Sequence, residues 1–445
     1  MANFVQRRQL AWLTQVARIG FALCFILPSI SASALAQPKV AAIKWGNHKQ
    51  DKAAVDAMLR DGNVGDADQK KFDEFFIEFV LPPIAKVTDP KQQTHDLPAV
   101  RADIKKYFRS ATGSAYDRLN SIVRDFMNFV IRKAPDRECK FNALLVLGDL
   151  NETEGTSTRP AKPLPDGLND LVQYLRMPRL PDYLRVGALV GVQRHALASA
   201  QYPIAPATQT EITTLMFSLL NLKEPPADRQ KNAHFYLRRT AAEILGALGN
   251  IGKDGANVLA VRDAMNERDA PNSFRIGLCN ALMLFDYSSA PAAKLDLKAL
   301  GEAACYAGID GAKIELARAD ALAQQKQIFV SPSRRTLGYC FSKPYLAFVS
   351  TAADRKNGRN GLVAAAAGKP EAKSLQSMQS EVLKILQYLD KLQKGDDVDS
   401  EKVTGMIASL ESALTKRPDA AKLQVDVAGA NDAAGKRGTP AAAPR

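Results

Sequence analysis

Apolar residues recur at spacings of three and four over residues 136–290, which predicts helices that each bury one face. Four segments of this region align with one another without gaps: CKFNALLVLGDL from Cys139, LRVGALVGVQRH from Leu184, LRRTAAEILGAL from Leu237 and FRIGLCNALMLF from Phe274. In each segment, core-sized residues stand at offsets 0, 4, 8 and 11 and therefore share a helical face. We expect an internal repeat built from similar helices.

The second position of each segment is basic, and the four residues are Lys140, Arg185, Arg238 and Arg275. They lie 45, 53 and 37 residues apart, and a HEAT-type helix pair needs about 40–47 residues. The intervals contain further apolar stripes at 166–177, 208–222 and 254–268, which predict the partner helices. Because stacked repeats place equivalent residues side by side, we expect these cations to pair with acids of adjacent repeats. An anion-binding row is the alternative.

Four glycines at intervals of three accompany the third segment: Gly246, Gly249, Gly252 and Gly255. A phosphate-binding Walker loop is excluded, because Ala247 stands where its first glycine belongs and Asp254 where its hydroxyl belongs. We instead expect Gly246 to allow a close approach between helices and Gly249 to form a left-handed C-cap. The other two are expected in the turn to the next helix.

The stretch LRRTAAEILGALGNIGKDGA resembles a HEAT repeat, specifically the phycobilisome-lyase-type HEAT-like unit with the pattern apolar-Arg-x-x-Ala-Ala-x-x-Leu-Gly-x-Leu-Gly. The matching residues are Arg238, Ala241, Ala242, Leu245, Gly246, Leu248 and Gly249. The match is partial at 137–152 and 182–197 and degenerate at 272–288. The resemblance implies an all-α solenoid of helix pairs whose usual role is protein binding. Lyase-type members act on tetrapyrrole–protein adducts, which makes an enzyme subunit a further alternative.

The flanks predict a cap on each side of the array. Residues 37–135 are helical in pattern without matching the repeat, and four phenylalanines between positions 72 and 79 indicate a capping core. We expect the repeat array at 136–350, a linker rich in Ala and Gly at 351–373 and a helical hairpin at 374–417. Residues 418–445, rich in Ala, Gly and Pro, are expected to be a disordered tail.

The hairpin carries a short heptad pattern. Leu375, Val382 and Leu389 are seven residues apart, and so are Met378, Ile385 and Leu392. Two and a half heptads are fewer than a sustained coiled coil shows. The pattern therefore leaves two alternatives, a hairpin that folds within the chain and self-association through residues 375–392.

The N-terminus predicts export. Arg7, Arg8 and Arg18 precede an apolar run at 19–30, and Ala34-Leu35-Ala36 follows, which is typical of a secretory signal peptide over 1–36. About 12 apolar residues are too few to span a membrane, which takes about 20. We expect a periplasmic or extracellular protein without a membrane span. Cleavage would remove three arginines and no acids, lowering the formal charge from +13 to +10.

No catalytic or metal-binding pattern emerges from the titratable residues. The four histidines are far apart, and Cys139, Cys279, Cys305 and Cys340 show no C-x-x-C spacing, so their disulfide state stays open. His195 occupies a core position of its segment, where we expect a buried histidine. We predict no cofactor and no catalytic residues.

These patterns favour an exported, non-catalytic scaffold that binds a protein partner. Tyr174, Arg176 and Phe217, on the predicted partner helices, are the candidate contacts. The alternative is electrostatic binding of an anionic envelope polymer or nucleic acid through the net positive charge.

Overall fold

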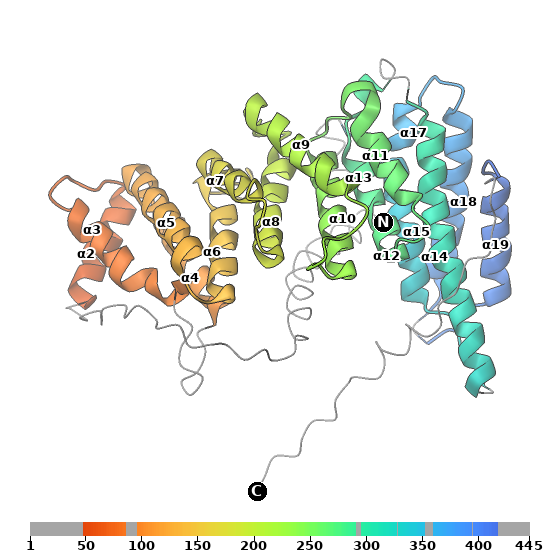
Figure 1. The fold of residues 1–445 in the computed structure, drawn as a ribbon, viewed down its shortest axis with the longest axis horizontal. Coiled ribbons are helices and arrows are strands. Elements are labelled where there is room, and N and C mark those ends of the chain that lie inside the picture. The colour runs from red at the N-terminus through yellow and green to blue at the C-terminus, as the bar shows by residue number, and fades with distance from the viewer. Residues whose placement is uncertain are drawn as a thin grey trace, which may run out of the picture. The chain divides into compact units, whose positions relative to one another are not determined.

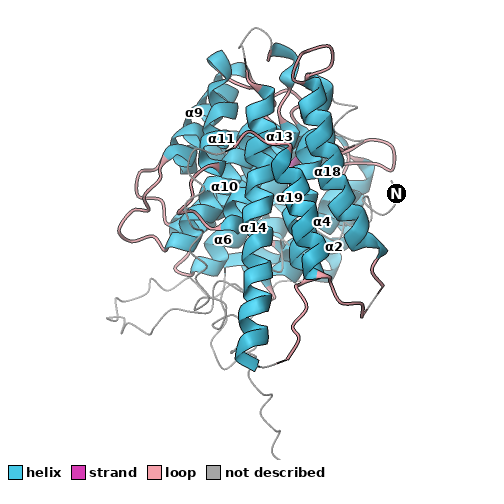
Figure 2. Ribbon diagram, turned by 90° about the vertical axis from the view of Figure 1, so that its right-hand side faces the viewer, coloured by secondary structure: helices cyan, strands magenta, loops and turns pink. Residues whose placement is uncertain are grey.

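The computed structural model describes residues 48–85, 96–290, 295–326, 328–351, 359–393 and 395–416. About 72% of the structure is helical and almost none of it is strand (Figures 1 and 2), which confirms the all-α class and is consistent with a solenoid-like fold. One short antiparallel pair, β1 (Asn151–Thr153) with β2 (Lys162–Pro163), interrupts the helices. The predicted signal peptide at 1–36 and the tail at 418–445 lie outside the described residues.

The N-terminal region consists of α2 (His48–Asp61), α3 (Gln69–Phe75), α4 (Leu97–Ser110) and α5 (Gly113–Lys133), with a π-helical turn at Phe76–Val80 and a 3-10 turn at Pro82–Ala85. The predicted phenylalanine core is present. Phe72 and Phe76 are fully buried with ring centroids 5.0 Å apart, and Tyr107 of α4 meets Phe76 edge-on at 5.3 Å. Helix α5 packs on α6, the first of the aligned helices.

The aligned segments form α6 (Arg137–Asp149), α8 (Asp182–Ala198), α10 (Lys231–Ala247) and the broken pair α12 (Asn272–Gly277) and α13 (Cys279–Leu284). The intervals form α7 (Pro165–Leu175), α9 (Pro206–Asn221) and α11 (Ala256–Met265), within a few residues of the predicted ranges. Helix α6 packs on α8, α8 on α10 and α10 on α13, so the segments stack in chain order.

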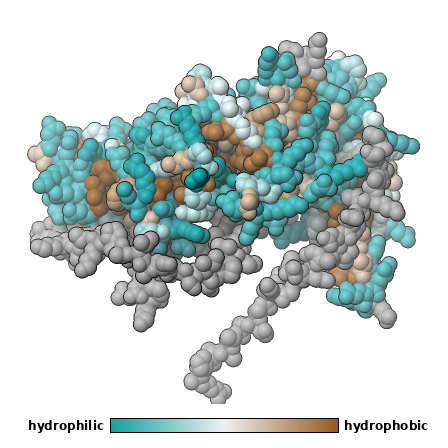
Figure 3. All heavy atoms as spheres, viewed as in Figure 1, coloured by the Kyte–Doolittle hydropathy of each residue, from teal (hydrophilic) through white to brown (hydrophobic). Residues whose placement is uncertain are grey.

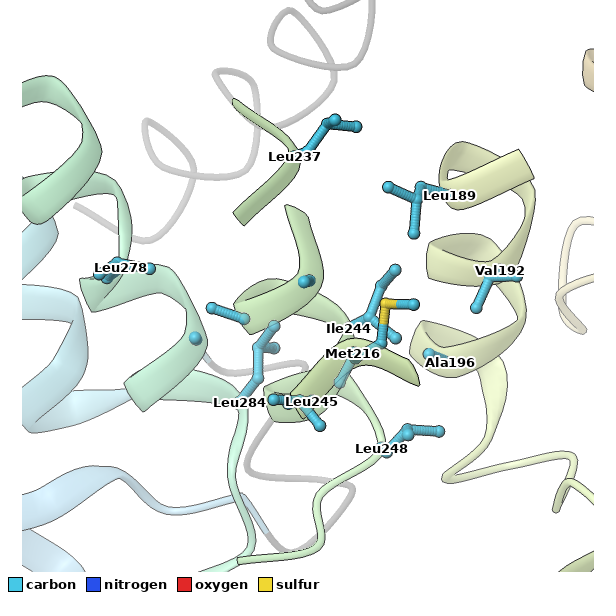
Figure 4. Close-up of a cluster of buried hydrophobic side chains, with 14 of the residues drawn as sticks. Leu189, Val192, Ala196, Met216, Leu237, Ile244, Leu245, Leu248, Leu278 and Leu284 are labelled. Carbon is cyan, nitrogen blue, oxygen red and sulfur yellow. The ribbon is translucent and has the colours of Figure 1, made fainter. Parts of the chain in front are cut away.

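Two of these contacts bring helix backbones close together. A Cβ on Gly246 would lie 2.4 Å from the carbonyl oxygen of Ala281, and one on Gly148 would lie 2.7 Å from the Cα of Gly191. Apolar side chains of α8, α9, α10 and α13 fill the space around the first contact (Figure 4). Gly249 has a φ of 76°, as a left-handed C-cap requires.

The array continues through α14 (Leu297–Lys326) and α15 (Arg334–Val349), which pack on each other. The described part of the predicted linker at 351–373 corrects that prediction. It forms α17 (Gly361–Ala365), whose Leu362 is fully buried against neighbouring helices, and Arg359 donates to the backbone carbonyl of Ala247. The composition suggested a loose connection, but burial of Leu362 and the hydrogen bond of Arg359 attach the segment to the neighbouring helices.

The hairpin is α18 (Ala372–Lys391) followed by α19 (Ser400–Ser412). The heptad residues of α18 are buried inside this chain, because α18 packs on α14, α15 and α17 as well as on α19. Leu375, Val382 and Ile385 are fully buried. Of the two alternatives, folding within the chain is the one observed, and of the six seam residues only Leu392 stays partly exposed, whereas self-association through 375–392 remains a prediction.

Candidate functional site

Arg238 of α10 is the most completely bonded of the four repeated cations. Its side chain is 1% exposed, and its Nε donates to the Leu220 carbonyl near the end of α9 at 2.8 Å. Its two terminal nitrogens donate to the two carboxylate oxygens of Glu267, each at 2.7 Å. The guanidinium also lies 5.0 Å from the centroid of the Phe274 ring. Arg238 thus ties its own helix to the end of the preceding helix and to the start of the next repeat.

Arg275 repeats this arrangement one unit further along. Its Nε donates at 2.7 Å to the carbonyl of Met265, the last residue of α11, and Nη2 donates at 2.8 Å to Asp310 of α14. Both carbonyl acceptors belong to helix C-terminal turns, which lack partners within their own helix. The two arginines therefore close helix ends and join neighbouring repeats.

The repeated cations of the first two segments, Lys140 and Arg185, are not bonded in this way. Arg185 reaches the Leu180 carbonyl at 3.4 Å, and its Nε lies 4.0 Å from Asp182, which instead accepts two bonds from Arg229. Burial, followed by the nearby charge of Arg229, lowers the pKa of Arg185. Lys140 makes no ion pair among the described residues. The expected pairing across repeats is therefore present at the last two positions only.

The structure corrects one of the three candidate partner contacts. Tyr174 is buried, and its hydroxyl donates to Asn128 of α5 at 2.8 Å. Phe217 is half-buried against the core, and exposed Arg176 is paired with Glu211 of α9. Tyr174 is therefore wrong as an exposed contact, because a helix 46 residues away in the chain covers it. Arg176 and Phe217 remain candidate partner contacts, because both keep some solvent exposure.

A second set of charged residues escaped the sequence analysis. We call it the α8–α15 polar cluster, and it consists of Gln193, Tyr236, Arg239, Glu243, Asn280 and Lys343. Glu243 is at its centre, with its side chain 9% exposed. Gln193 of α8 donates to one carboxylate oxygen at 2.9 Å, and Asn280 of α13 donates to the other at 3.2 Å. Amides from both neighbouring helices thus fix the carboxylate in place.

Arg239 is the least satisfied cation of this cluster. Its Nε lies 3.9 Å from Glu243, beyond hydrogen-bond distance, and its guanidinium stacks over the Tyr236 ring at 5.5 Å. Its Nε is buried without a hydrogen-bond partner in the described structure, although the side chain as a whole is 29% exposed. Arg239 therefore combines solvent access with donors that the fold leaves unused.

Lys343 of α15 adds a second positive charge. Burial lowers the pKa of Lys343, the negative charge of Glu243 raises it, and the positive charge of Arg239 lowers it. The cluster thus holds two cations and one carboxylate.

Repeat geometry places Arg239 where an earlier repeat has an aromatic ring. Arg239 and Phe141 are the third residues of their aligned segments. A Cβ on Gly277 would lie 2.5 Å from Arg239 Cδ, and one on Gly187 would lie 3.2 Å from the Phe141 ring. Each side chain therefore covers a glycine of the next aligned helix. This position, apolar in the other three segments, was the available sequence signal for the cluster.

The remaining reactive groups are held in unreactive states. Burial raises the pKa of Cys139 to about 11 and of Cys279 and Cys340 to about 12, which disfavours the nucleophilic thiolates. All four described cysteines are buried free thiols. His195 is buried, and desolvation followed by the charge of Arg194 lowers its pKa to about 3. Among the described residues, no group of three His, Cys, Asp or Glu side chains could hold a metal ion.

Exposed apolar side chains are scattered. The large ones are Ile77, Phe129, Met177, Leu197, Leu222, Ile328 and Phe329. On the face shown in Figure 3, hydrophilic side chains predominate and hydrophobic ones form separate patches. No helix in the described parts of the chain is long and apolar enough to cross a membrane.

No protein-family model matches the chain, and comparisons with curated proteins and with solved structures find no match.

Proposed function

We propose that the mature chain is an exported, non-catalytic HEAT-like scaffold that binds a protein partner through the face of α8, α10, α13 and α15. The observation that carries this proposal is the α8–α15 polar cluster. It unites residues from successive stacked helices, and it leaves Arg239 both accessible and without a hydrogen bond in the described structure. Stacked helices of this kind provide extended surfaces that suit another polypeptide.

The environments of the other charged and potentially reactive side chains favour a binding protein over an enzyme. Arg238 and Arg275 donate their hydrogen bonds to groups of neighbouring repeats, and the cysteine thiols are buried with raised pKa values. A lyase-type enzyme subunit would need a nucleophile or an acid–base pair, and neither is assembled among the described residues.

Electrostatic binding of an anionic polymer is the second candidate, because the mature sequence is basic. Basic and acidic side chains are nearly equal in number over the described residues, so most of the surplus falls in the remaining segments. This balance favours a protein partner, since a polyanion-binding fold concentrates cations on its surface.

The first experiment is a crosslinking pull-down with tagged residues 37–445 from a native envelope extract at low and high salt. A discrete protein recovered at both salt concentrations, which forms a defined complex when purified with the chain, is the expected result. Recovery of only salt-labile anionic material would replace the scaffold with the electrostatic binder.

Export is tested separately by fractionation and N-terminal sequencing of the protein from its native host. We expect an exported protein beginning at Gln37. An intact N-terminus in the cytoplasmic fraction would contradict this part of the proposal.

A further inference from the structure

The C-terminal end of α14 projects beyond its neighbours α15, α18 and α19 (Figures 1 and 2). Burial decreases along this end, because Leu316 and Ala319 are buried whereas residues 324–326 are exposed. In the connection to α15, Ile328 and Phe329 are 59% and 66% exposed. They are the two most exposed large apolar residues in the described parts of the chain, and they are consecutive. We call this pair the α14 tip.

The base of the same connection is attached to the array. Pro332 is buried, and the Ser331 hydroxyl accepts a hydrogen bond from the Val398 backbone at 2.7 Å. Arg334, the first residue of α15, donates to the carbonyl of Leu392 after α18. The fold thus fixes the base and leaves most of the surface of the α14 tip in water. Adjacent exposed apolar side chains on a projection are typical of a contact with another surface.

Three cations flank the α14 tip. Lys326 ends α14, and Arg334 and Arg335 begin α15. In the described structure none of them pairs with a carboxylate, because Arg334 bonds to backbone carbonyls while Lys326 and Arg335 are exposed. The sequence from 321 to 336 contains no Asp or Glu. Acidic residues between 390 and 399 adjoin the connection at Ser331 and Arg334, on the array side of the tip.

The shape of this projection suits a lipid surface better than a protein. A stable protein interface buries about 800 Å² on each partner, which two side chains at the end of one helix cannot provide. The interface of a bilayer accepts apolar side chains individually, and anionic headgroups attract neighbouring Lys and Arg. Apolar contact and charge complementarity therefore indicate the same partner.

We propose that the α14 tip inserts into the headgroup region of an anionic lipid surface. Ile328 and Phe329 enter the interface, and Lys326, Arg334 and Arg335 face the acidic headgroups. The contact is peripheral and reversible, because so few apolar side chains provide only weak anchoring. This inference goes beyond the proposed scaffold function and does not depend on it.

The first test is flotation of residues 37–445 with vesicles of phosphatidylcholine, alone or mixed equally with phosphatidylglycerol, up to millimolar lipid at low salt. We expect binding to the anionic vesicles only. Phe329→Ala should weaken it about tenfold through lost apolar contact. Lys326→Gln and Arg335→Gln should each weaken it about fivefold, the contribution of one cation near an anionic surface. Phe129→Ala, which removes a 55% exposed ring from α5, is the matched control and should bind as wild type does.

Three results of this test would overturn the proposal. They are no binding to anionic vesicles, equal binding to neutral vesicles, and unchanged binding of Phe329→Ala. Circular dichroism of each variant checks that the helices are retained.

A fluorescent reporter then locates the contact. Trp45 is the only tryptophan in residues 37–445, so Trp45→Phe combined with Phe329→Trp gives a single probe at the α14 tip. Trp45→Phe combined with Phe129→Trp is the matched control. Anionic vesicles should shift the emission of the first protein to shorter wavelength and protect it from iodide, without changing the second. Equal responses, or none, contradict the proposal. A shift that appears on raising the protein concentration without lipid would assign the tip to a second copy of the chain and overturn the lipid contact.

Discussion

Arg238 and Arg239 are adjacent in the sequence and have opposite roles in the structure. Arg238 points toward the junction of α9 and α11, where a helix-end carbonyl and Glu267 satisfy its donors. Arg239 lies on the face shared with α13 and α15, and makes no hydrogen bond in the described part of the chain. Two identical side chains thus differ because only one of them faces the end of a neighbouring helix.

The comparison separates charge that holds the array together from charge that is available to a ligand. A buried guanidinium is stabilising only when its donors are satisfied. Arg238 meets that condition within the fold, and Arg239 would meet it through a partner. Net charge alone could not have made this distinction.

The largest expected effect is that of Arg238→Ala. Removing the guanidinium leaves Glu267 and the Leu220 carbonyl without their partner, and breaking a buried ion pair typically costs about 3–5 kcal/mol. Urea unfolding followed by circular dichroism should show a clearly lower midpoint. Lys140→Ala changes the equivalent position, which has no ion pair in the described structure, and should be nearly neutral. Equal midpoints for the two variants would refute the assignment of Arg238 as a junction residue.

Gly246→Ala should have the next largest effect. The added Cβ would lie 2.4 Å from a backbone carbonyl of α13, so one helix must move, and overpacking of this kind costs about 1–3 kcal/mol. Gly338 of α15 is the matched control, because a Cβ there meets nothing within 4 Å. Gly338→Ala should stabilise the chain by about 0.5–1 kcal/mol through helix propensity. A stabilising Gly246→Ala would show that the helices do not approach so closely.

The periodicity of the sequence correctly predicted those features that each helix determines by itself, namely its position in the chain and its buried face. The aligned segments gave α6, α8 and α10, the interval stripes gave their partner helices, and every heptad position of α18 except Leu392 is buried. The role of Gly246 was also predictable, because small residues recur where helices meet. Local pattern carries this information since each helix buries the apolar stripe that its own sequence defines.

The features that the sequence analysis missed depend on which segment, distant in the sequence, packs against a given side chain. Tyr174 is covered by α5, and the α8–α15 polar cluster draws on residues from 193 to 343. Neither has a local motif. The helical segment around Leu362 was missed because alanine and glycine dominate its surroundings and hide a single anchoring residue.

His195 should make a smaller contribution to stability, and this contribution should depend on pH. Because burial lowers its pKa from about 6.5 to about 3, the ring stays neutral in the fold, while the unfolded chain takes up a proton below about pH 6.5. Stability should therefore fall as the pH drops, by about 1 kcal/mol between pH 6 and pH 5 from this residue. In His195→Leu, that part of the slope should vanish, as measured by urea unfolding across pH. An unchanged slope would mean that His195 is accessible to protons in the fold.

The smallest expected change in stability is that of Arg239→Gln. In the described structure the guanidinium only stacks on Tyr236 and is weakly attracted to Glu243, so removing it should cost about 0.5 kcal/mol or less. Set beside Arg238→Ala, this variant provides the sharpest form of the comparison. Arg238→Ala should alter unfolding, and Arg239→Gln should weaken binding of the protein partner with little change in unfolding. If Arg239→Gln destabilises the chain as strongly as Arg238→Ala does, both arginines stabilise the array. The α8–α15 polar cluster would then no longer support the proposed partner-binding surface.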